Sequence, residues 1–268
     1  MAETQIQILS DLHLETPPSY DIFNITPHAR HLALLGDIGY VKEPGFFLFL
    51  RRQLSAFHTV LFLLGNHEPY HSNWPSTRAK MKEFETEMAQ QYQDGKILGK
   101  FVLLDQTRCD ISPSVSILGC TLYSHVPPEQ TESVSFGVQD FYNIEDWSID
   151  DHRAAHSADL AWLNTRVESI SRLEPDRKIV IFTHHSPCID ERTIDPRHAG
   201  SNRSSGFMSD LSKEACWTSK NVKIWAYGHT HFNCDFEDSA TGKRVVANQR
   251  GYYFSQSSGF GEGKIIQL

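Results

Sequence analysis

Polar strings rich in aspartate and histidine follow apolar runs at five points of the chain. These strings are Asp11-Leu12-His13, Gly36-Asp37, Gly65-Asn66-His67-Glu68, His184-His185 and Gly228-His229-Thr230-His231. Carboxylate, amide and imidazole groups are ligands for divalent metals, and two metals held side by side can clamp one oxyanion. The residue types are therefore suited to the cleavage of a phosphate ester at a two-metal site.

Each string taken alone also has an ordinary structural explanation. Asp11 could cap a helix, Asp37 could satisfy its own turn, and the Asn66-His67 pair could belong to a plain loop. Their joint occurrence is more informative, because ligand sites in α/β sheets lie at the carboxyl ends of the strands. Gly36 fits this arrangement, since a glycine lets the chain turn sharply and approach a ligand closely.

The elements that must position these residues are read from the hydrophobic pattern. Strands are expected at Ile6–Leu9, Leu32–Leu35, Val60–Leu64, Phe101–Leu104, Val115–Cys120, Ile179–Thr183 and Ile224–Tyr227. The early runs are nearly continuous in apolar residues, which is typical of strands buried on both faces. Helical patterns separate them at Phe46–Phe57, Ser76–Tyr92 and Asp151–Leu173.

The last third of the chain is rich in short strand-like runs. We expect strands at Phe232–Phe236, Arg244–Asn248, Tyr252–Ser255 and Lys264–Leu268, with a hairpin connection at 238–243. This order predicts two sheets packed face to face with helices outside, in a single domain of residues 1–268. The irregular stretch Cys188–Ser209 is long for a compact domain, and loops of that length are often functional.

Composition narrows the partners and the compartment. The formal net charge of −8 disfavours binding to duplex nucleic acid or to an anionic membrane, because such surfaces require a basic stripe. The odd count of five cysteines, with no close pair, predicts reduced thiols and a cytoplasmic protein. The sequence contains neither a secretory signal nor an apolar run of about 18 residues, so no membrane span is expected.

The five strings resemble the pattern of the calcineurin-like metallophosphoesterase superfamily, which reads D-x-H, G-D, G-N-H-(D/E), a later His and G-H-x-H. The resemblance extends from Asp11 to His231. It implies a four-layer α/β/β/α sandwich, with two mixed sheets flanked by helices and a two-metal centre at the carboxyl ends of the strands. It also implies hydrolysis of phosphomonoesters or phosphodiesters, and here we expect a small or nucleotide-like substrate.

The resemblance also implies a role for each matching residue. Asp37 would bridge two divalent ions (Mn, Fe or Zn). The first ion would also be held by Asp11, His13 and His231, and the second by Asn66, His184 and His229. His67 would face the substrate beside Asn66 and protonate the leaving oxygen, with Glu68 holding its ring. His185 is expected behind the ligands.

Further residues are candidates for substrate contact on position alone. Arg250 could fork onto a phosphate, although an exposed hairpin arginine is the slightly better interpretation. The stretch Cys188–Ser209 directly follows the His184 string and should overhang the site, which would bring Arg192, Arg197, Asn202 and Arg203 near the substrate. The segment Asp140–Asn143 could form another wall.

Other functions remain open at the level of sequence. The chain could be a catalytically silent scaffold with this fold, but the strings are intact. A nuclease is disfavoured by the acidic charge. A protein phosphatase is disfavoured because Asp37 is followed by Ile38-Gly39-Tyr40 instead of the longer string G-D-x-x-D-R-G. The leading prediction is a phosphoesterase, with phosphodiesters favoured, whose oligomeric state the sequence leaves open.

Overall fold

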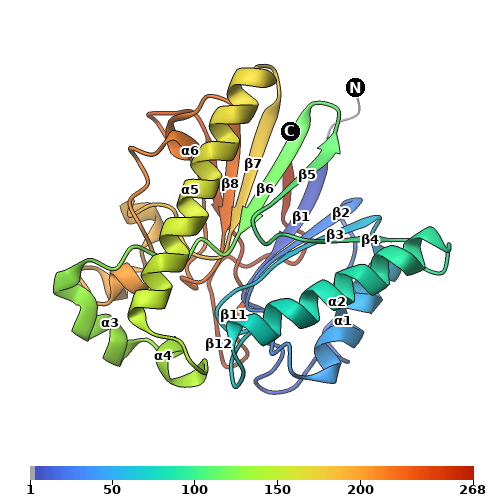
Figure 1. Cartoon of the computed structure of the whole chain (residues 1–268), viewed down its shortest axis with the longest axis horizontal. Helices are drawn as coiled ribbons and strands as arrows, with labels where there is room; N and C mark the ends of the chain where they lie inside the picture. Colours follow the sequence, from blue (N-terminus) through green and yellow to red (C-terminus); the bar gives the residue numbers. More distant parts are fainter. Residues whose placement is uncertain (1–3) are drawn as a thin grey trace.

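Two large β-sheets form the centre of the computed structural model, which describes residues 4–268 (Figure 1). The five-stranded sheet has the order β13 (Ile265–Gln267), β1 (Gln5–Leu9), β2 (His31–Leu35), β3 (Thr59–Leu63) and β4 (Lys100–Leu103). Strands β1 to β4 are parallel, and β13 is antiparallel to β1.

The six-stranded sheet has the order β5 (Thr107–Ser112), β6 (Val115–Cys120), β7 (Lys178–Thr183), β8 (Val222–Tyr227), β10 (Arg244–Ala247) and β9 (Cys234–Glu237). Its four inner strands are parallel, and both edge strands are antiparallel to their neighbours. Both sheets are therefore mixed, with parallel centres that direct their carboxyl ends the same way within each sheet.

Burial on both faces explains why the central strands are so apolar. In β7, Ile179 and Ile181 belong to the core beneath the helices, whereas Val180 and Phe182 belong to the core between the two sheets. Every residue of β3 is buried in the same way. Alternate side chains thus enter two different cores, so both faces of these strands are predominantly apolar.

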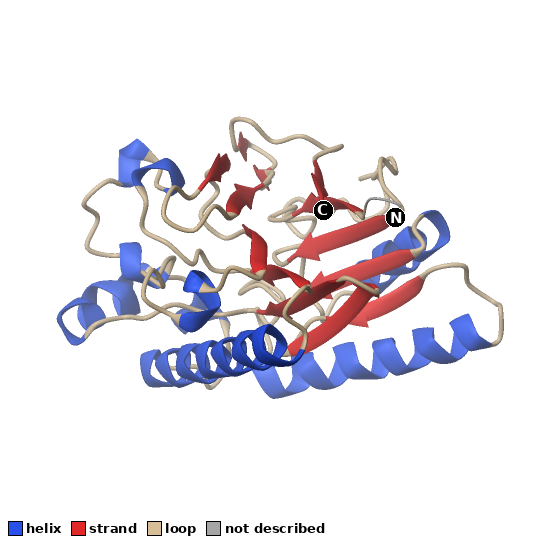
Figure 2. Cartoon of the chain, turned by 90° about the horizontal axis from the view of Figure 1, so that it is seen from above, coloured by secondary structure: helices blue, strands red, loops and turns tan. Residues whose placement is uncertain are grey.

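Helices cover the outer face of each sheet (Figures 1 and 2). Helices α1 (Pro44–Ala56) and α2 (Trp74–Gln93) pack on the five-stranded sheet. Helices α5 (Ile149–Leu173) and α6 (Ala215–Thr218) pack on the six-stranded sheet. The predicted four-layer α/β/β/α sandwich is therefore confirmed.

Local capping accounts for where the two longest helices begin. The side chain of Asn73 accepts a hydrogen bond from the Ser76 N–H at 2.9 Å at the start of α2. Ser148 and Asp151 form a reciprocal capping box at the start of α5. Each cap satisfies backbone donors that have no partner within the helix.

Several elements differ from the sequence-based prediction. The predicted strand Tyr252–Ser255 is wrong, because this segment is the turn of a small hairpin formed by β11 (Gly251–Tyr252) and β12 (Ser255–Gln256). Strand β5 was not predicted, and neither were the short helices α3 (Thr131–Gly137) and α4 (Asp140–Asn143). The stretch Cys188–Ser209 contains three single-turn 3₁₀ helices, Glu191–Thr193, Pro196–His198 and Ser204–Gly206; another, Pro128–Gln130, precedes α3.

Two further properties follow from the described residues. All five cysteines have free thiols. Within residues 4–268, no helix combines the length and the apolar character that a membrane-spanning segment needs.

Candidate metal centre

The metal-ligand candidates all lie in loops that directly follow the carboxyl ends of parallel strands. Strands β1, β2 and β3 supply one group from the five-stranded sheet, and β7 and β8 supply the other from the six-stranded sheet. The two sheets pack face to face, so the loops of both meet in one place, and the structure brings all seven candidates together. They are Asp11, His13, Asp37, Asn66, His184, His229 and His231.

Five of these residues have an unusual backbone conformation. Asp11, His13, Asp37, His229 and His231 all have positive φ angles, between 46° and 70°. A residue with a side chain rarely adopts this left-handed conformation, which costs of order 1–3 kcal/mol and persists only where surrounding contacts enforce it. The rest of the fold therefore holds these side chains in place against a local cost.

Glycines at the strand ends make the close packing possible. A Cβ atom on Gly36, whose φ is +86°, would lie 2.6 Å from His184 Nδ1. A Cβ atom on Gly65 would come within 2.6 Å of the Asp37 backbone nitrogen and closer still to its carboxylate. Three of the five strings begin with glycine, at Gly36, Gly65 and Gly228, and at each of these a neighbouring ligand occupies the space of a side chain.

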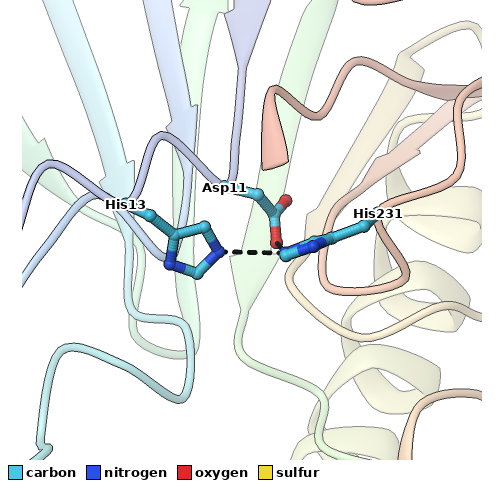
Figure 3. A group of neighbouring side chains, drawn as sticks. All are labelled: Asp11, His13 and His231. Atoms are coloured by element: carbon cyan, nitrogen blue, oxygen red, sulfur yellow. Dashed lines mark hydrogen bonds and ion pairs between the residues drawn. The ribbon is translucent and has the colours of Figure 1, made fainter. Parts of the chain in front are cut away.

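The first ligand cluster consists of Asp11, His13 and His231 (Figure 3). His13 Nε2 and His231 Nε2 are 2.9 Å apart, and His231 Nε2 is 3.4 Å from Asp11 Oδ1. The backbone N–H of His229 donates to Asp11 Oδ1 at 3.0 Å, which fixes the carboxylate. Two imidazole nitrogens and a carboxylate oxygen thus converge on one point.

The second ligand cluster consists of Asp37, Asn66, His184 and His229. His184 Nε2 lies 2.9 Å from Asn66 Oδ1 and 3.4 Å from Asp37 Oδ1. Asp140 Oδ1 accepts hydrogen bonds from Asn66 Nδ2 and from the Tyr70 hydroxyl, each at 2.7 Å. Asp140 therefore orients the amide of Asn66 so that its oxygen faces the cluster.

Asp37 lies between the two clusters. Its Oδ1 faces His184 of the second cluster, and its Oδ2 lies 3.9 Å from His13 Nε2 of the first. One carboxylate thus presents one oxygen to each cluster. This is the placement that a bridging ligand requires.

The donor set fits divalent metals. His229 Nε2 is buried and has no hydrogen-bond partner within residues 4–268, which is a costly state for a polar atom unless a ligand completes it. Burial, together with the charge of His184, lowers the pKa of His229 to about 3, so its ring is neutral and free to coordinate. Nitrogen and oxygen donors of this kind suit Mn, Fe or Zn.

His67 is held by a residue that the sequence analysis missed. Glu15 Oε1 contacts His67 Nδ1 at 3.0 Å and His13 Nδ1 at 3.1 Å, so one oxygen orients both rings. Burial disfavours the charged form of Glu15, but its hydrogen bonds to the two histidines outweigh burial and lower its pKa to about 2. Burial also disfavours protonated His67, but the charges of Asp37 and Glu15 prevail and raise its pKa to about 9. The signal that could have identified Glu15 in the sequence is its position two residues after His13, in the alternating series Asp11, His13 and Glu15.

Glu68 has a different role from the one expected. Its carboxylate accepts backbone N–H groups of Asp37 at 3.0 Å, Ile38 at 2.8 Å and Gly65 at 2.7 Å. The prediction that it holds the His67 ring is therefore wrong, because its oxygens instead join the loops after β2 and β3. Burial, followed by the charge of Asp37, raises the pKa of Glu68 to about 8.

Arg250 does not face the site as predicted. Its guanidinium donates to the Leu12 carbonyl at 2.9 Å and lies 4.7 Å from the centre of the Phe23 ring. This side chain supports the loop after β1 from behind, and it does not line the cavity described below. The neighbouring Tyr252 reaches the site instead, since its ring stacks on His13 at 4.1 Å and its hydroxyl lies 3.3 Å from His67 Nε2.

A cavity of about 640 Å³ opens over the two clusters. Its floor includes Asp37, Asn66, His67, His229 and His231, and we call residues 137–140 and 193–208 its outer wall. The predicted overhang of Cys188–Ser209 is thus present, and Asn202, Arg203 and Asp140 line the cavity. Arg192 and Arg197 do not. His185 lies behind the ligands, with its ring centre 4.2 Å from that of His229.

Comparison with known proteins agrees with this fold. An uncharacterized protein of Acanthamoeba polyphaga mimivirus is 26% identical over 267 residues, covering 92% of this chain and 91% of that protein. The solved structure of a phosphopantetheinyl hydrolase from Mycobacterium tuberculosis matches with a TM-score of 0.69 at 16% identity, covering 100% of this chain and 96% of that one. A dimetal phosphatase from Danio rerio matches with a TM-score of 0.57 at 14% identity, covering 99% of this chain and 98% of that one. At such identities these two structures establish a shared fold.

The family assignment comes from a sequence model. The model of the calcineurin-like phosphoesterases matches residues 4–233, which is most of the chain and includes every ligand candidate named above. The chain therefore belongs to the calcineurin-like phosphoesterase family, whose members are metal-dependent phosphoesterases.

Proposed function

We propose that the protein hydrolyses a small or nucleotide-like phosphoester, with a phosphodiester favoured over a phosphomonoester. The observation that carries this proposal is the placement of Asp37 between two ligand clusters at the floor of a cavity of about 640 Å³. Pockets of this size hold whole small molecules, which is more than a free phosphate needs.

The proposal assigns one metal ion to each cluster. Asp11, His13 and His231 would hold the first ion, while Asn66, His184 and His229 would hold the second. Asp37 would bind both. When bound, the two ions supply positive charge for the phosphoryl oxygens and lower the pKa of an attacking water.

His67 is the proposed proton donor to the leaving oxygen. Its Nδ1 is engaged by Glu15, so Nε2 is the nitrogen directed toward the cavity, 3.9 Å from Asp37 Oδ2. A donor placed beside the reacting phosphate typically accelerates such a step by 10²–10⁴-fold. Glu15 and Tyr252 would fix the plane of this ring.

The test is an assay after reconstitution with Mn, Fe or Zn, in which bis-p-nitrophenyl phosphate is compared with p-nitrophenyl phosphate. We expect turnover of both, with a higher kcat/KM for the diester, and loss of turnover in Asp37→Asn. A reconstituted protein that contains metal and cleaves neither compound would contradict the proposal. A panel of cyclic nucleotides would then narrow the substrate.

A further inference from the structure

The outer wall and the residues just before it contain three arginines, and two of them are neutralised locally. Arg192 pairs with Asp190 at 2.7 Å, and Arg197 pairs with Asp195 at 2.6 Å. In both pairs the aspartate stands two residues before the arginine. The repeated Asp-x-Arg spacing therefore cancels the charge of each side chain within its own turn.

Arg203 breaks this pattern. The residue two positions before it is Ser201, and within residues 4–268 no carboxylate lies within 4.0 Å of its guanidinium. Ser201 Oγ accepts the backbone N–H of Arg203 at 3.3 Å, so the local turn is kept while the acidic partner is missing. Among the three arginines, Arg203 alone lines the cavity.

The position of the Arg203 side chain is defined by α3. A Cβ atom on Gly137, the last residue of α3, would lie 2.9 Å from Arg203 Cζ and closer to its Nε. The guanidinium therefore crosses the bare backbone of Gly137. Because Gly137 has no side chain, the end of α3 leaves space for the guanidinium of Arg203.

The surroundings of Arg203 favour an anion. Two of the carboxylates that line the cavity are already engaged, since Asp195 pairs with Arg197 and Asp140 accepts from Asn66 and Tyr70. Ser201 and Ser204 add hydroxyl groups to the same stretch of the wall. A guanidinium with neighbouring hydroxyls is a set of donors suited to phosphate oxygens.

We propose that Arg203 is a specificity-determining residue that binds a second phosphate group of the substrate, remote from the one that is cleaved. This inference rests on the proposed function, because it assumes that the scissile phosphate occupies the floor at Asp37. It narrows the substrate class to phosphoesters that carry a further phosphate on the same molecule. One charge-assisted contact at this exposed site corresponds to about a tenfold gain in affinity.

The test uses bisphosphates of linear alkanediols, from ethanediol to octanediol, because the series covers a range of separations between the two phosphates. Each is compared with the monophosphate of the same diol. Binding to the Mn-reconstituted protein is measured by calorimetry, and inhibition of p-nitrophenyl phosphate turnover is measured in parallel. We expect at least one bisphosphate to bind about tenfold more tightly than its monophosphate.

Two variants assign that preference to Arg203. Arg203→Gln should reduce the affinity ratio of bisphosphate to monophosphate to about one. Gly137→Ala should reduce it as well, because the new methyl group displaces the guanidinium while alanine remains favourable in a helix. Arg192→Gln is the matched control, because it removes one positive charge next to the outer wall from a side chain that does not line the cavity, and it should retain the ratio.

The outcomes separate this inference from the proposed function. Turnover of p-nitrophenyl phosphate without a preference for any bisphosphate would overturn the inference alone. A calorimetric preference that Arg203→Gln abolishes, in a protein without turnover, would support the inference and contradict the proposed function. An equal loss of the ratio in Arg192→Gln would show a general charge effect and overturn the role of Arg203.

Discussion

The floor of the cavity and its outer wall are built in opposite ways. On the floor, Asp37 is buried, as is Glu68 next to the floor residue His67, and both are tied to other strand-end loops by hydrogen bonds. In the wall, the Asp195–Arg197 ion pair joins residues only two positions apart, within a single 3₁₀ turn. The fold as a whole therefore determines the geometry of the metal centre, whereas local turns shape the cavity above it.

This contrast leads to different expectations for change in the two regions. A substitution on the floor disturbs several elements at once, since Asp37 and Asn66 contact His184 and His229 contacts Asp11, in each case across the two sheets. A substitution of Asp195 or Arg197 in the wall changes one turn and the shape of the cavity above the metals. Binding and catalytic loops on a rigid scaffold commonly vary in this manner.

The largest effect is expected for Asp37→Asn. Loss of the shared carboxylate removes one ligand from each cluster and leaves an amide that binds cations weakly. We predict a loss of at least one of the two metals and a decrease in kcat/KM of roughly 10³-fold, since metal-based charge stabilisation is worth several kcal/mol. Metal analysis and steady-state kinetics on the same preparation check this, and retention of both ions would remove Asp37 as the bridge.

His67→Ala should have the next largest effect and should separate chemistry from metal binding. We predict that metal content stays near that of the wild-type protein, while kcat falls by ~10²-fold or more because the leaving oxygen has lost its proton donor. The loss should be smaller for a substrate with a good leaving group such as p-nitrophenolate. Full activity in this variant would exclude His67 from the mechanism.

Glu15→Gln tests the carboxylate oxygen that is shared by the rings of His13 and His67. This substitution keeps the size of the side chain but removes the charge that orients His13 and His67. We predict a loss of about 10–100-fold in metal affinity or in kcat, as is typical when the partner of a ligating histidine is changed. Glu15→Asp should recover part of it. Equal activity and metal affinity in wild type and Glu15→Gln would show that backbone contacts alone hold these rings.

A pair of glycine substitutions compares the stability of the two regions directly. Gly65→Ala on the floor places a methyl group against the backbone of Asp37, and we predict destabilisation by roughly 3 kcal/mol through overpacking. In Gly200→Ala, in the wall, the new methyl group would meet no atom within 4 Å, but the backbone there has φ of +74°. We therefore predict destabilisation by only about 1 kcal/mol. Denaturant unfolding of both variants measures the difference, and equal losses would contradict the contrast between floor and wall.

The sequence predicted the floor well because its signals are strong and local. Strand β3 is buried throughout and therefore reads as an unbroken apolar run, and the glycine and ligand strings follow such runs directly. Strand β5 was missed because it lies at a sheet edge and its residues alternate between half-buried and exposed. From its sequence alone, β5 resembles a polar loop, and only its pairing with β6 identifies it as a strand.

The roles of individual side chains were harder to predict. Glu15 and Glu68 are both acidic residues near histidines, and sequence alone assigned the His67 ring to the adjacent one. The structure reverses this, because Glu68 is directed toward three backbone donors and Glu15 reaches both rings from another loop. Such a choice depends on tertiary contacts over long separations, as does the inward path of Arg250 to the Leu12 carbonyl.

The placement of Asp37 between two ions is tested most directly by a crystal structure of the protein reconstituted with Mn, with anomalous scattering recorded to locate the ions. We predict two anomalous peaks, one on each side of the Asp37 carboxylate, with His13 and His231 at one and His184 and His229 at the other. A single peak, or ions bound away from Asp37, would contradict it.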